Sequence, residues 1–151
     1  MDNDRMAHCP RWAELPSLGL YMDQVLLVLT EALAPVTAGD QVTATMVGNY
    51  VKMKLVRPSE KKKYAREHLA RLIMISLFKH VLSMAEIARV LEALTADRAI
   101  GEAYDLFCAR LEALLASPAA PPEEDGLPLL PAAAVRTLAD KLVFERMLAE
   151  E

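Results

Sequence analysis

Apolar residues recur at helical spacing along most of the chain. Between Tyr21 and Leu33 they fall on every third or fourth position, as in the buried stripe of an amphipathic helix. The same spacing predicts five further helices, over Ala44–Met53, Arg66–His80, Ser83–Leu94, Ala99–Ala116 and Ala132–Ala149. We therefore expect an all-α, mainly helical protein.

Two of these helices carry clear start signals. Thr43 is a good N-cap for the helix that follows it, and Ser83 with Glu86 forms the S-x-x-E pattern of a capping box. The helix over Arg66–His80 is apolar around most of its circumference. We therefore expect it to lie at the centre of the fold.

Prolines divide the chain. Pro10 and Pro16 discourage helix formation near the N-terminus, although a lone Trp12 should dock on an apolar surface. Five prolines between positions 117 and 131 indicate a linker. These breaks predict an N-terminal tail (1–16), a first domain (17–96) and a C-terminal helical region (97–151) that contains the Pro-rich linker (117–131).

A turn-rich segment lies between the second and third predicted helices. Arg57-Pro58-Ser59-Glu60 has the composition of a turn. Leu55 and Val56 before it could pair with Lys63–Ala65 after it, which would give a small two-stranded wing tipped by Lys61 and Lys62.

Charge is distributed unevenly along the chain. The stretch from Tyr50 to Arg71 holds eight basic and two acidic residues, a net charge of +6. The whole chain carries −4, which leaves −10 for the remaining residues. A basic island in an acidic protein is typical of a phosphate-binding face. Aromatic residues make up only 5% of the chain, which argues against a stacking platform for single-stranded nucleic acid.

The segment from Thr43 to Leu94 contains a recognisable series of stretches: Val47-Gly48-Asn49-Tyr50, Leu55-Val56-Arg57-Pro58, Tyr64, Leu69, Leu72, and Leu82-Ser83-Met84-Ala85-Glu86-Ile87. In these stretches the segment resembles the DNA-binding head of MerR-type regulators. This resemblance implies a MerR-like winged helix-turn-helix with extra C-terminal helices. The chain differs from that pattern at Gly48 (usually arginine), Asn49 (usually aromatic) and Lys54 (usually glycine, which suits a left-handed helix cap).

A second resemblance covers Tyr21 to Leu94. The string T-A-T-M…N-Y-V-K…K-K-Y-x-R-E-H-L is similar to that of an uncharacterised bacterial family, domain of unknown function eighteen-thirty-six. This resemblance implies no activity.

If the helix-turn-helix interpretation holds, lysines and an arginine would contact phosphates. The exposed face of the second helix would read bases, and a tyrosine would pack the wing and donate to a phosphate. The residues predicted to contact duplex DNA are Thr45, Met46, Asn49, Lys52, Lys54, Lys61, Lys62, Lys63, Tyr64 and Arg66. Two heads joined by their C-terminal helices would form a homodimer, and the C-terminal region leaves room for an unknown small-molecule effector.

We therefore expect a bacterial transcriptional regulator that binds duplex DNA. The alternative is a non-catalytic helical protein–protein interaction module that retains the winged-helix shape. The sequence has no catalytic constellation, cofactor motif or metal-ligand spacing, so we expect neither an enzyme nor a metalloprotein. Cys9 and Cys108 fit a reduced cytoplasmic protein, and the apolar runs are too short to cross a membrane.

Overall fold

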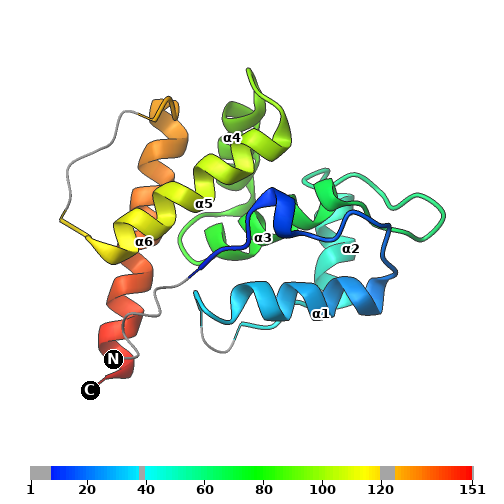
Figure 1. Cartoon of the computed structure of the whole chain (residues 1–151), viewed down its shortest axis with the longest axis horizontal. Helices are drawn as coiled ribbons and strands as arrows, with labels where there is room; N and C mark the ends of the chain where they lie inside the picture. Colours follow the sequence, from blue (N-terminus) through cyan, green and yellow to red (C-terminus); the bar gives the residue numbers. More distant parts are fainter. Residues whose placement is uncertain (1–7, 38–39, 120–124, 151) are drawn as a thin grey trace.

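The described part of the protein is mainly helical. The computed structural model describes residues 8–37, 40–119 and 125–150. Their helices, shown in Figure 1, are η2 (Trp12–Glu14), α1 (Met22–Leu33), α2 (Ala44–Lys52), α3 (Arg66–Phe78), α4 (Met84–Thr95), α5 (Ile100–Ala116) and α6 (Leu129–Ala149). The expected all-α fold is thus confirmed. None of these helices is both long and apolar enough to span a membrane.

Helix α3 is the centre of the fold. Ten of its thirteen residues are buried, so it presents apolar side chains in every direction. It packs against α1, α5 and α6, and the rings of Phe78 in α3 and Phe107 in α5 meet edge to face, 5.2 Å apart. The predicted central position of this helix is confirmed.

The two predicted helix starts are also confirmed. Thr43 Oγ1 accepts a hydrogen bond from the Met46 amide at 3.1 Å. Ser83 and Glu86 bond reciprocally: the Glu86 amide donates to Ser83 Oγ at 3.2 Å, and the Ser83 amide donates to Glu86 Oε1 at 2.8 Å. Each cap satisfies backbone amides that have no partner within the helix.

Helix α6 begins earlier than the sequence predicts. Leu129, Leu130 and Pro131, placed in the Pro-rich linker, form its first turn, and residues 120–124 of that linker lie outside the described part. Proline is tolerated at this position because the first amides of a helix have no internal partner. Helix α6 then packs against α3, α4 and α5, so the C-terminal helices share the core with α3.

Residues 8–16 of the predicted tail run along α5, while residues 1–7 lie outside the described part. Arg11 forms a bidentate pair with Glu112, with N–O distances of 2.7 and 3.0 Å. The Tyr104 hydroxyl donates to the Pro10 carbonyl at 2.6 Å. The Trp12 ring lies directly on Gly101, which confirms that this tryptophan docks against the body of the protein.

The segment between α2 and α3, residues 53–65, is called the basic loop below. The predicted pairing of Leu55 and Val56 with Lys63–Ala65 is not found, and no strand occurs within this described segment. Instead, isolated bridges join Leu20 to Tyr64 and Glu60 to Lys63. The backbone of Leu55 is already engaged: its amide donates to the Tyr50 carbonyl, and its carbonyl accepts from Arg71. A strand ladder there would have to break both bonds.

Replacing Gly101 with alanine should displace Trp12. A Cβ at this position would lie 2.9 Å from Trp12 Cδ2, which is closer than two carbons can approach. We expect a net loss of about 1–2 kcal/mol in the free energy of unfolding, as for other overpacked sites. Because Trp12 is the only tryptophan, its fluorescence should also shift to longer wavelength as the ring meets water.

Gly48→Ala is the matched control, because a Cβ on Gly48 meets nothing within 4 Å. This variant should be more stable by up to ~1 kcal/mol, the ordinary helix-propensity gain, with unchanged fluorescence. Equal effects of the two substitutions in urea unfolding would contradict the proposed role of Gly101.

Candidate nucleic-acid interface

Helix α2 exposes a polar stripe. Val47 and Tyr50 turn into the core, and burial raises the pKa of the Tyr50 hydroxyl. The opposite side carries exposed residues three or four positions apart: Thr45, Gly48, Asn49 and Lys52. Met46, which was also predicted to read bases, is half-buried against the core.

The C-terminus of α2 closes with a left-handed cap. The Lys54 amide donates to the Val51 carbonyl, and the Leu55 amide donates to the Tyr50 carbonyl, both at 3.0 Å. This pair of bonds defines a Schellman motif, whose left-handed position is usually glycine. Here that position is Lys54, with φ of 62°.

The tip of the basic loop has the same left-handed backbone. Glu60 and Lys63 exchange both backbone hydrogen bonds, at 3.0 and 2.9 Å. Lys61 and Lys62 between them have φ of 52° and 67°, the signature of a type I′ turn, which normally takes asparagine and glycine. Within the described residues, every non-glycine residue with positive φ is therefore a lysine.

Several contacts anchor the basic loop to α3. Arg57 forms an ion pair with Glu67 at 3.0 Å, and this hydrogen bond is the main cause that lowers the pKa of the Glu67 carboxyl. His68 is buried at the start of α3. Its Nδ1 accepts from the Ala65 amide at 2.8 Å, so its Nε2 carries the proton and donates to the Pro58 carbonyl at 3.2 Å.

Other contacts hold the loop to α1 and to the N-terminal segment. The Lys63 ammonium lies 5.5 Å from the centre of the Tyr21 ring, and Tyr64 pairs with Leu20 through its backbone. Tyr64 is half-buried, and its ring meets His68 edge to face. The residues beside the tip thus hold the tip in place.

Arg66 is separate from the other predicted contacts. Its Nε donates to the Leu15 carbonyl at 3.2 Å, and its guanidinium lies 5.5 Å from the centre of the Trp12 ring. The structure therefore places Arg66 against the N-terminal segment.

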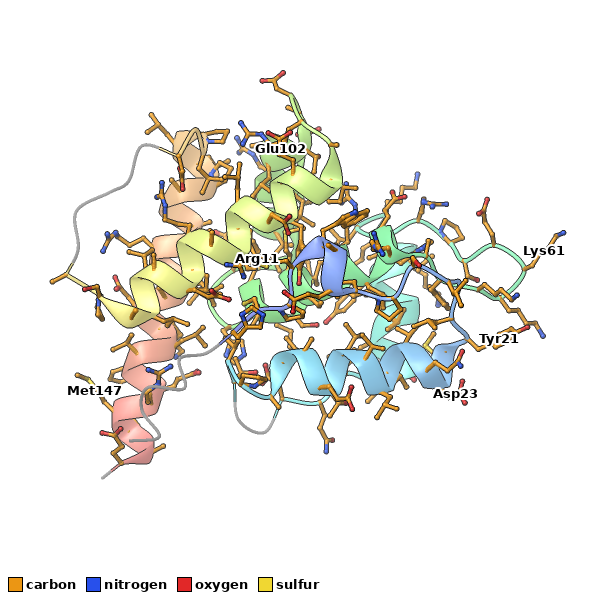
Figure 2. All side chains as sticks on the ribbon, viewed as in Figure 1. Arg11, Tyr21, Asp23, Lys61, Glu102 and Met147 are labelled. Carbon is orange, nitrogen blue, oxygen red and sulfur yellow. The ribbon has the colours of Figure 1, made fainter. Side chains whose placement is uncertain are left out.

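The remaining lysines form two groups. Lys61, Lys62 and Lys63 lie at the tip of the basic loop. Figure 2 shows Lys61 at the extreme end of the molecule, away from Met147 in α6. Lys52 and Lys54 instead line a cleft of about 530 Å³ between the end of α2 and the start of α3. Arg57 and Arg71 line the same cleft. These two arginines belong to the basic stretch from Tyr50 to Arg71, but their place in the cleft could not be predicted from spacing, because it depends on how α3 lies against the end of α2.

Among the described residues, no group of three or more His, Cys, Asp and Glu side chains has an arrangement that could hold a metal ion. What the site presents is a set of fixed cations and a polar helix face. Both suit the recognition of an anion.

The family model described as Domain of unknown function (DUF1836) matches residues 10–107. The chain belongs to this family. No curated protein and no solved structure matches it. The DUF1836 match extends from Pro10, beside Trp12, to Phe107 in α5, so it includes the N-terminal segment, α1–α4, the basic loop and the first half of α5.

Glycine at the loop tip of this DUF1836 protein should stabilise it. A left-handed conformation costs an L-residue about 1–2 kcal/mol, and glycine avoids most of that cost. We expect Lys61→Gly and Lys62→Gly each to raise the free energy of unfolding by about 1 kcal/mol relative to the matched Lys→Ala variants. Urea unfolding measures the difference, and the alanine variants control for the lost charge. Equal stability of the two series would contradict a strained tip.

Proposed function

We propose that this DUF1836 protein is a bacterial transcriptional regulator that binds duplex DNA through α2 and the basic loop, with α1 and α2 acting as a helix-turn-helix and the loop as its wing. The single observation that carries the proposal is the identity of the three left-handed residues. Lys54, Lys61 and Lys62 all occupy positions that glycine or asparagine would fill at lower cost.

The presence of lysine at these strained positions favours a use for the ammonium group itself. All three side chains are exposed, and none pairs with a carboxylate in the part of the chain that is described. Duplex DNA supplies closely spaced phosphates, which such a group of cations would neutralise. Left-handed backbone also makes the turn tight, which narrows the loop tip to two residues.

The exposed stripe of α2 supports a role for this helix in reading the DNA sequence. Thr45 and Asn49 project on the side of α2 away from the core, and asparagine pairs well with the adenine edge in the major groove. Gly48 lies between them, and nothing inside the protein requires a glycine there. A missing side chain on an exposed helix face allows close approach of another molecule. Met46 would contact a base only through the exposed part of its side chain.

We assign supporting roles to the other predicted residues. Lys52 lies on the exposed stripe and Lys63 beside the tip, where both can reach phosphates. Tyr64 packs the loop, and Arg66 holds the N-terminal segment under it. The protein would therefore act by binding, without catalysis.

We also propose that the protein works as a homodimer joined through the end of α6. Phe144, Met147 and Leu148 are all more than half exposed, at the three- and four-residue spacing of one helical stripe. Figure 1 shows α6 at the opposite end of the molecule from the basic loop. A dimer joined there would leave both DNA-binding heads free to reach half-sites about 34 Å apart or a multiple of it.

The salt dependence of DNA binding tests the proposed function. The probe is duplex DNA from upstream of the protein's own gene, with a scrambled duplex for comparison. For Lys54→Gln/Lys61→Gln/Lys62→Gln, we expect the slope of log affinity against log salt to become shallower by about 0.9 for each lost phosphate contact.

A charge-matched control separates direct phosphate contacts from a general effect of the protein's net charge. Lys79→Gln/Arg89→Gln/Arg146→Gln removes three exposed cations elsewhere, so its slope should stay close to that of the wild type. If the wild type binds no duplex, or if both triple variants change the slope equally, the DNA-binding proposal fails. Binding to a protein partner with no salt slope would then favour the interaction-module alternative.

Sedimentation tests the homodimer. Met147→Glu/Leu148→Glu should weaken self-association at least tenfold, because it places two charges in an apolar contact; tenfold corresponds to about 1.4 kcal/mol. Leu18→Glu, at a residue that is 79% exposed near the other end of the chain, should leave association unchanged. A wild-type protein that sediments as a monomer would contradict the dimer.

A further inference from the structure

The cleft beside α2 contains uncompensated positive charge. Its charged walls are Lys52, Lys54, Arg57 and Arg71, with Glu67 as the single acid. Glu67 is already paired with Arg57 at 3.0 Å. Within the described residues, Lys52, Lys54 and Arg71 have no carboxylate partner, so three cations face the same space without an anion.

Arg71 is the most informative of the three. It lies in the second turn of α3, half-buried, and the bond from its Nη1 to the Leu55 carbonyl at 3.2 Å satisfies only one of its five donors. Burial lowers the pKa of its guanidinium, and the nearby charge of Glu67 acts in the other direction. Proteins normally pair a cation that is withdrawn from water, because its desolvation is otherwise uncompensated.

The rest of the lining is apolar. Val51 and Pro58 contribute hydrocarbon to the walls, and the buried residues Leu55 and Val56 also line the cleft. A volume of about 530 Å³ falls within the range of small-molecule sites, which bury a mostly apolar ligand and fix it by a few polar groups. The lining therefore suits an anionic head group attached to a compact apolar body.

We infer that this cleft binds a small amphiphilic organic anion, a phosphate monoester or a carboxylate, with its head group on Arg71 and its body against Val51 and Pro58. Guanidinium groups bind both head groups through paired hydrogen bonds. Lys52 and Lys54 line this cleft and also belong to the proposed DNA-contacting set. Occupancy should therefore weaken DNA binding, a consequence that rests on the proposed function.

The first test uses no DNA. Phenyl phosphate is titrated into the full chain and followed by amide chemical shifts, with inorganic phosphate and phenol as partial probes at matched ionic strength. We expect phenyl phosphate to bind most tightly and to perturb the amides of residues 51–57 and 67–71. Arg71→Gln should weaken binding about tenfold or more, as expected for a lost hydrogen bond between charged groups.

Two variants act as controls. Arg71→Lys keeps the charge and should retain part of the affinity, whereas Arg89→Gln on α4 removes an exposed charge outside the cleft and should have no effect. If Arg71→Gln fails to fold, Lys54→Gln takes its place in the same titration. Equal binding of phenyl phosphate and phenol, equal losses in Arg71→Gln and Arg89→Gln, or shifts spread over the surface would overturn the site.

The second test adds duplex DNA. Saturating phenyl phosphate should lower DNA affinity severalfold more than inorganic phosphate does at the same ionic strength, and Arg71→Gln should remove that difference. DNA binding without any specific phenyl phosphate site would refute the cleft and leave the proposed function standing. A specific phenyl phosphate site in a protein that binds no DNA would support the cleft and refute the proposed function.

Discussion

Burial of α3 on all sides is the constraint on which the rest of the structure depends. A helix with ten buried residues out of thirteen must be covered by neighbours, and α1, α5 and α6 provide that cover. The start of α3 also fixes the basic loop, because His68 bonds both Ala65 and Pro58 from its single buried ring. The core and the cationic surface are therefore linked through one helix, and loosening α3 would release the loop.

The basic loop combines firm anchoring with local strain. Ion pairing, a buried histidine and a bridge to Leu20 hold its two ends, while its tip and the cap of α2 keep lysines in left-handed conformations. Strain of this kind persists only where the surroundings enforce it, and it is concentrated at functional sites. The anchoring contacts thus stabilise the strained backbone conformation. That conformation in turn sets the position of the lysine charges.

Much of the helical framework could be predicted from local patterns. The caps at Thr43 and Ser83, the central place of α3 and the docking of Trp12 follow from residue types and spacing, and all are found. The geometry of the basic loop could not be predicted in this way. Leu55 reads as a strand residue, but its amide completes the cap of α2. The bond from Arg66 to Leu15, fifty-one positions earlier, also has no local signal in the sequence. Both outcomes depend on contacts between distant segments, which a local pattern does not contain.

A footprint on this chain is the sharpest test of where a nucleic acid would lie. Amide chemical shifts would be recorded before and after adding duplex DNA. We expect shift changes concentrated in residues 44–54 and 59–64, and no contact-induced change in the last two turns of α6. Changes centred on α5 and α6, or no change in the basic loop when DNA is bound, would contradict it.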